Sequence, residues 1–417
     1  MKEFIETIRT KNFTFLWGSQ VISQFIFNTL SFLIITRIFE LTGSTIAVSF
    51  VWVSYALPAL LFGPLGAVTA DIADKRKVMT VSILLQAAVV FVFAYFYAHY
   101  VFLSYAVVFI YSMINQFYMP SEAAALPQIV ARNRLPQANS LFFITVQVGL
   151  VAGFTLAGVF YNSVGIGPTL LASSFLLLAA AINLKMLPLL RSGKKIPKGF
   201  EKGVVEFFSD IVIGYKFIKN TKAILFPFIL LIGLQAALSV VVVNLPVITS
   251  DILKTKASFS GLLIIAPAAV GALIGTALIS KLLTKRVRKR RLIEYGLFVL
   301  ALCLLILSTI VPVVYFWIGR PLAILVFLFA GASYVFGLIP SLTYLQEVTP
   351  EDLMGRVFGN IWFITTVVTV IPVLFSATIT EIFGVRLLLF ILGVVGVAVV
   401  LLSRTIIRKV SNYAKRL

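Results

Sequence analysis

Gly66-Ala67-Val68-Thr69-Ala70-Asp71-Ile72-Ala73-Asp74-Lys75-Arg76-Lys77 is the stretch that decides the fold. It joins two long apolar runs, 44–70 and 78–98, neither of which contains Asp, Glu, Lys or Arg. Residues 71–77 carry two acids and three bases, and charges this dense cannot lie in hydrocarbon. The sequence therefore predicts a tight turn at the membrane surface, and its simplest interpretation is a solvated loop with topogenic charges. Small residues just before the turn would let another helix approach closely, namely Gly63, Gly66, Ala67 and Ala70.

The composition is that of an integral membrane protein. Hydrophobic residues make up 60% of the 417 residues and charged residues 12%, whereas a soluble domain has about 45–50% and about 25%. A chain of this length has room for roughly twelve spans of about 20 residues. The net charge of +20 lies in loops between the spans, so no nucleic-acid partner is expected.

Several absences limit the function further. The single cysteine, Cys303, lies in an apolar run and is interpreted as a small core hydrophobe. No GxxxxGK[ST] phosphate loop occurs, so we expect no ATPase subunit, and we expect no enzymatic activity, cofactor or metal. Residues 1–12 are charged and are followed by a span too long for a signal peptide, so none is expected.

Hydropathy predicts an all-α membrane protein with twelve spans in two halves. The N-terminal bundle is expected over 1–190, a cytoplasmic linker over 191–222 and the C-terminal bundle over 223–417. In the linker, Val204, Phe207, Phe208, Ile211, Tyr215 and Ile218 recur at helical spacing, which predicts an amphipathic helix at the inner membrane surface. The predicted spans are 13–39, 44–70, 77–98, 101–126, 138–162, 167–190, 223–250, 257–283, 291–311, 317–346, 354–380 and 385–403.

Basic residues set the predicted orientation. With the N-terminus in the cytoplasm, all but five of the 35 Lys and Arg fall on the inner side. This asymmetry indicates that both termini are cytoplasmic. The five exceptions are Arg37, Lys254, Lys256, Arg320 and Arg386.

The opening stretch resembles the signature between helices 2 and 3 of the major facilitator superfamily, which is a glycine, three residues, an aspartate and then a basic cluster. Asp71, Asp74, Lys75, Arg76 and Lys77 match it, while the glycine position is Ala67 and the residue after the first Asp is Ile72. The resemblance implies that these five residues form a conformational gate. Gly355 and Arg356, before span eleven, would belong to the same gate.

Further motifs resemble the macrolide-efflux and enterobactin-export branch of that superfamily. They are Asn12-Phe13, Leu126-Pro127, Ala138-Asn139-Ser140-Leu141 and Gly355-Arg356-Val357-Phe358. The resemblance implies twelve transmembrane helices in two pseudo-symmetric six-helix bundles and alternating access. It also implies export of small molecules and proton antiport.

Polar side chains inside the spans indicate a cavity. Gln20, Gln24 and Asn28 are four residues apart and form one stripe on span one, which must face inward because unsatisfied amides are costly in lipid. The stripe is interpreted as a wall of a substrate cavity, with interhelical hydrogen bonding as the alternative. Other candidates for the cavity wall are Asn115, Gln116, Gln147, Gln235, Ser239, Tyr334 and Trp362.

No Asp, Glu, Lys, Arg or His side chain lies near the centre of a predicted span. The carboxylates that remain as candidate proton acceptors are Asp71, Glu122 and Glu347, all at inner ends of spans. The sequence thus predicts a monomeric exporter of drug-like or siderophore-like amphipathic molecules in the cytoplasmic membrane of a prokaryote, in contact with the lipid bilayer. A lipid or lysophospholipid translocator of the same fold, or a membrane receptor or scaffold, are the alternatives.

Overall fold

The computed structural model describes residues 6–98, 100–131, 134–190, 215–284, 287–350 and 364–414. It also describes Val205, Ser209, Val212, Ile213, Leu353, Val357 and Ile361. The chain divides into two compact units. Unit 1 comprises Met1–Gly43 and Ala47–Val212, and unit 2 comprises Ser44–Ile46 and Ile213–Leu417.

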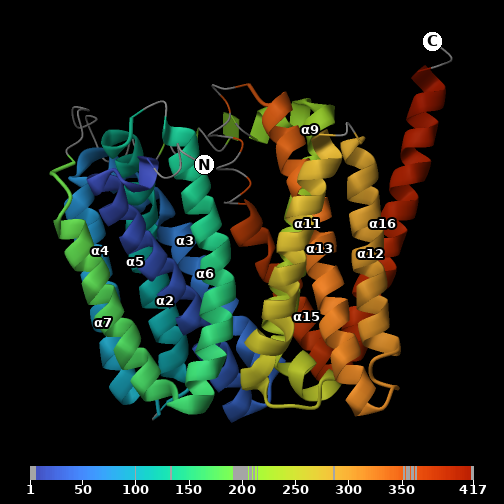
Figure 1. The fold of residues 1–417 in the computed structure, drawn as a ribbon, viewed down its shortest axis with the longest axis horizontal. Coiled ribbons are helices and arrows are strands. Elements are labelled where there is room, and N and C mark those ends of the chain that lie inside the picture. Colours follow the sequence, from blue (N-terminus) through green and yellow to red (C-terminus); the bar gives the residue numbers. More distant parts are fainter. Residues whose placement is uncertain are drawn as a thin grey trace. The chain divides into compact units, whose positions relative to one another are not determined.

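The described part of unit 1 contains six long helices, α2 to α7, which lie side by side in Figure 1. Within it α2 packs on α6 and α7, while α4 packs on α5 and α7. Gly43, with φ of 63°, ends the first helix in the left-handed conformation that favours glycine. The helices are α2 (Lys11–Thr42), α3 (Thr45–Ile72), α4 (Lys75–Phe96), α5 (Phe102–Ile129), α6 (Leu135–Ser163) and α7 (Ile166–Lys185).

In the part of unit 2 that the structure describes, a bent segment is followed by five helices. Its core helix α13 packs on α9, α11 and α12, and α12 also packs on α16. The described helices after the bend are α11 (Ala266–Thr284), α12 (Lys289–Thr309), α13 (Phe316–Val348), α15 (Val370–Phe383) and α16 (Val385–Ala414).

The bent segment of unit 2 begins with α9 (Lys222–Val243) and turns by 56° at Asn244. Beyond it lie α10 (Leu245–Val247), the π-helix η2 (Ile248–Ile252), the 3-10 helix η3 (Ala257–Phe259) and the π-helix η4 (Gly261–Ile265). Pro246, near the start of α10, cannot donate a backbone hydrogen bond to the preceding turn, which explains a break at this point.

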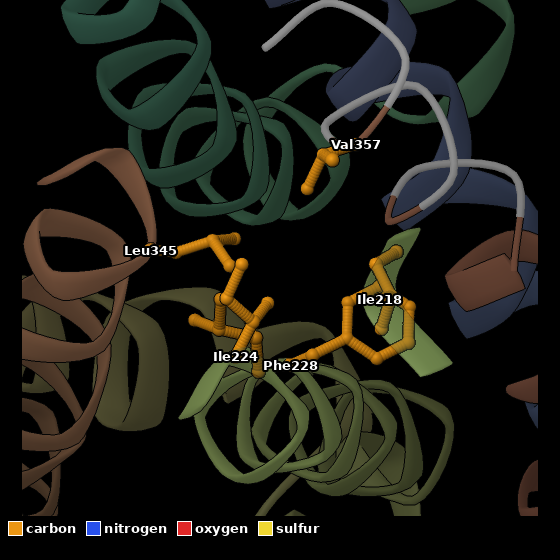
Figure 2. Packing of buried hydrophobic residues seen from close by; sticks show 6 residues of the cluster. Ile218, Ile224, Phe228, Leu345 and Val357 are labelled. Carbon is orange, nitrogen blue, oxygen red and sulfur yellow. The ribbon is translucent and has the colours of Figure 1, made fainter. Parts of the chain in front are cut away.

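One end of α9 packs into a hydrophobic cluster (Figure 2). Ile224, Phe228 and Leu231 of α9 form a cluster with Leu345 of α13, and Ile218 and Val357 belong to the same cluster. Ile218 is 2% exposed, although the amphipathic pattern places it in a surface helix. Residues 191–204 of the predicted linker lie outside the described residues, as do Phe207, Phe208 and Ile211 of its predicted amphipathic helix.

The described helices support the predicted membrane architecture. Ten of them are long and apolar enough to cross a membrane, and the bent pair at Asn244 gives an eleventh. The predicted twelfth span corresponds to a shorter apolar helix, Val385–Leu401. The predicted turn at 66–77 is shorter than expected, because α3 continues to Ile72 and only Ala73 and Asp74 separate it from α4.

Candidate functional site

Asp74 organises the charged turn of unit 1. Its Oδ1 accepts from the backbone N–H of Lys77 at 3.4 Å, which caps the N-terminus of α4, and from that of Leu190 at 3.3 Å. The Leu190 carbonyl in turn accepts from the backbone N–H of Lys75 at 3.2 Å. Lys75 is only 3% exposed, whereas Asp71 lies exposed in the last turn of α3. The two aspartates of the signature therefore have different surroundings.

The glycine of this stretch lies against α5. A Cβ built on Gly66 would lie 1.8 Å from the carbonyl oxygen of Gln116, whereas one on Gly63 would meet only the Gln116 Oε1 atom at 3.9 Å. The backbones of α3 and α5 thus touch at Gly66, which confirms the close approach predicted from the small residues.

The polar stripe of α2 faces α6. A Cβ on Gly153 would lie 2.5 Å from the Asn28 Cβ, and one on Gly149 would lie 3.1 Å from the Gln24 Cβ. Gln20 Nε2 donates to the Phe142 carbonyl of α6 at 3.5 Å, while Gln20 Oε1 is buried with no hydrogen-bond partner. The Asn28 amide donates to the Gln24 carbonyl at 2.8 Å. The stripe therefore takes part in helix packing, and its one buried unpartnered amide oxygen is on Gln20.

A second polar group joins three helices of unit 1. The hydroxyls of Ser31 on α2 and Tyr55 on α3 lie 2.6 Å apart, and Ser112 on α5 donates to the Tyr55 carbonyl at 2.9 Å. The ring of Phe27 lies 5.3 Å from the Tyr55 ring and 6.2 Å from the Tyr111 ring, measured between centroids. We call these five residues the aromatic–hydroxyl group. It combines flat apolar faces with hydroxyls, as small-molecule sites do.

The remaining predicted cavity residues of unit 1 do not all meet. Asn115 Oδ1 accepts from Gln86 of α4 at 3.5 Å, and the Gln116 amide donates to the Ser112 carbonyl at 3.2 Å. Gln147 is exposed on α6. Tyr55 and Gln86 were not predicted from the sequence as candidate site residues. Each is a polar side chain inside an apolar run, which is the same signal that pointed to the candidates in the other spans.

In unit 2 the structure brings two predicted residues together. The Tyr334 hydroxyl of α13 donates to Gln235 Oε1 of α9 at 3.2 Å. Ser239, one turn further along α9, is buried. At the bend, Asn244 Nδ2 donates to the Val240 carbonyl at 2.8 Å and to Ser376 Oγ at 3.3 Å. Three predicted site residues, Trp362, Gly355 and Arg356, lie outside the described residues.

The three candidate proton acceptors differ in burial. Asp71 is exposed, and Glu347 forms an ion pair with Lys289 at a side-chain exposure of 58%. Glu122 is 5% exposed, and its Oε1 accepts from the Tyr118 hydroxyl at 2.8 Å. Of the Asp and Glu side chains that the structure describes, Glu122 alone is buried. The same part of the chain contains no group of three His, Cys, Asp or Glu side chains that could hold a metal ion.

Comparison with known proteins assigns the family. Residues 16–372 match the family model described as Major Facilitator Superfamily. The chain belongs to the Major Facilitator Superfamily. Members of this superfamily are membrane carriers, so the chain is a multi-pass membrane transporter. It is 26% identical over 360 residues to an uncharacterized MFS-type transporter of Bacillus subtilis (strain 168), YfiS, covering 85% of this chain and 83% of the relative.

Solved structures of two transporters share the fold. The nucleoside transporter NupG superposes with a TM-score of 0.69 at 13% identity, covering 93% of this chain and 97% of that one. A POT family transporter in complex with 5-aminolevulinic acid superposes with a TM-score of 0.73 at 12% identity, covering 94% and 95%. At these identities the likeness is one of fold alone.

Proposed function

We propose that this transporter exports small amphipathic or hydrophobic molecules, of drug-like or siderophore-like chemistry, across the cytoplasmic membrane. The observation that carries the proposal is the aromatic–hydroxyl group, in which Phe27, Tyr55 and Tyr111 lie together with the hydroxyls of Ser31 and Ser112. Aromatic faces suit the apolar part of such a solute, and a few hydroxyls orient its polar part. The Tyr334–Gln235 pair offers the same combination in unit 2.

The proposed architecture is the one on which alternating access depends. We place twelve helices in two six-helix bundles, with Val385–Leu401 as the last span, both termini in the cytoplasm and the protein as a monomer. Each conformational state would open the substrate site to one side of the membrane. The residues that match the family signature would stabilise one of these conformational states relative to the other. They are Asp71, Asp74, Lys75, Arg76 and Lys77.

Proton coupling is assigned to Glu122. Its carboxyl group is buried beside Tyr118, whereas Asp71 and Glu347 are exposed to solvent in the structure. An enclosed carboxyl group exchanges its proton only when the surrounding helices move, which links protonation to the conformational change.

The test is transport into inverted membrane vesicles. A hydrophobic cationic dye, a catecholate siderophore and a labelled lysophospholipid are supplied separately, with and without an imposed pH gradient. Uptake of the dye or siderophore above vesicles without the protein supports the proposal. Uptake of the lysophospholipid alone would replace it with a lipid translocator, and uptake of none of the three would contradict it.

The aromatic–hydroxyl group provides a variant for the same assay. Tyr111→Ala removes one aromatic wall, while Tyr95→Ala removes an equally large side chain that is 58% exposed on α4. Uptake should fall in the first variant and persist in the second. If Tyr111→Ala and Tyr95→Ala both take up substrate as the parent does, the aromatic–hydroxyl group is not part of the substrate site.

A further inference from the structure

A groove runs along the surface of unit 1 between α4 and α5. It encloses about 400 Å³, within the range of about 300–1,000 Å³ found for ligand pockets. Its walls are apolar apart from a lysine at one end and one serine. Eight residues line this α4–α5 groove: Lys77, Val78, Val81, Ser82, Leu85, Met113, Ile114 and Phe117.

The position of the groove along α4 matches one leaflet of a bilayer. Lys77 lies in the first turn of α4, and Leu85 lies eight residues further on, a rise of about 12 Å. Half of a hydrocarbon core is about 15 Å thick. The groove thus extends from the charged end of the helix almost to the middle of the membrane. Val81 and Leu85 are 54% and 51% exposed, so the groove is open at the protein surface.

Charge complementarity decides which molecule fits. Lys75, Arg76 and Lys77 occupy the first turn of α4, which holds no acidic residue. The N-terminus of a helix carries a partial positive charge that favours anions, and the three bases add to it, while the Asp74 carboxylate at the N-cap offsets part of it. The Asp74 carboxylate is directed at the backbone N–H groups of Lys77 and Leu190. The positive-inside rule accounts for basic residues in this turn, but it does not account for an apolar groove that begins at one of them.

We propose that the α4–α5 groove binds one acyl chain of an anionic phospholipid of the inner leaflet, with the headgroup phosphate at Lys77. The apolar walls take up the chain, and the ammonium group attracts the phosphate and the further negative charge of the headgroup. The site is separate from the substrate site proposed above. It lies on the open face of α4 and α5 and shares no residue with the aromatic–hydroxyl group.

The test measures lipid retention by native mass spectrometry. The purified full-length protein is incubated with phosphatidylglycerol and phosphatidylcholine of identical acyl chains, at equal concentration, and the ratio of the two retained lipids is recorded. Lys77→Gln should lower the ratio of phosphatidylglycerol to phosphatidylcholine by about fivefold, the effect of one basic side chain at an anionic surface. Lys185→Gln, which changes an exposed lysine in the last turn of α7, should leave the ratio unchanged.

A second pair of variants tests the acyl-chain part of the site. Val81→Trp fills the groove and should lower retention of both lipids, whereas Val92→Trp, at a side chain 55% exposed further along α4, should not. Leu85→Trp repeats the measurement one turn deeper if Val81→Trp does not yield a monodisperse protein. The proposal is overturned if Lys77→Gln behaves as Lys185→Gln does. It is also overturned if the groove-filling variant retains both lipids as the parent does, because the groove then holds no acyl chain. In that case Lys77 could at most bind a free phosphate.

Discussion

Gly66 provides the sharpest test of the packing between α3 and α5. In Gly66→Ala the new methyl group would lie 1.8 Å from the Gln116 carbonyl oxygen, whereas carbon atoms in contact prefer about 3.5–4.0 Å. The two helices would have to separate by roughly 1.5 Å or more at this point. Overpacking of this kind costs about 1–3 kcal/mol or more, which exceeds the gain of about 1 kcal/mol from replacing glycine by alanine in a helix.

Gly63→Ala is the matched control, because it makes the same chemical change one turn earlier on α3. Its methyl group would meet only the Gln116 Oε1 atom at 3.9 Å, an ordinary contact. The change should therefore leave stability equal or raise it by up to about 1 kcal/mol.

The two variants are compared by heating the detergent-solubilised protein and measuring the monodisperse fraction by size-exclusion chromatography. Gly66→Ala should lose half of this fraction at a temperature several degrees below the parent, and Gly63→Ala at the parent's temperature or above. Equal temperatures for the two variants would show that α3 and α5 do not touch at Gly66 in the folded protein.

Three further changes test the site. Tyr55→Phe removes the hydroxyl that lies 2.6 Å from Ser31 Oγ. It should cost about 1 kcal/mol of stability and change the uptake of the dye relative to that of the siderophore. An unchanged ratio of the two uptakes would place the hydroxyl outside the substrate site. Asp74→Ala removes the cap of α4 and should lower the free energy of unfolding by about 1 kcal/mol. Asp71→Ala, at an exposed position, should change the free energy of unfolding by no more than about 0.5 kcal/mol. A larger loss in Asp71→Ala than in Asp74→Ala would contradict these roles. Glu122→Gln retains an acceptor for the Tyr118 hydroxyl, so it should keep the fold but abolish the dependence of uptake on a pH gradient. Gradient-driven uptake at the parent's rate would refute the assignment of proton coupling to Glu122.

Much of the fold could be predicted because the signals are local. The predicted spans fall largely on helices where the structure describes them, and most of the first part of the span 354–380 lies outside the described residues. A run without charge crosses hydrocarbon as a helix because the helix satisfies its own backbone hydrogen bonds. The exact length of the turn at 66–77 could not be predicted, because the helical hydrogen bonds of α3 continue through Asp71 to Ile72. The bend at Asn244 was not predicted either, although Pro246 marks it.

The sequence by itself determined that this chain crosses the membrane many times, roughly where its spans lie, and which side chains inside them are polar. Only the tertiary structure decided the neighbours of those side chains. It places Asn115 beside Gln86, Tyr334 beside Gln235, and the stripe at Asn28 against Gly153. The physical reason is that lipid tails are as apolar as a protein core, so the hydropathy of a spanning helix does not reveal which face meets lipid and which meets another helix.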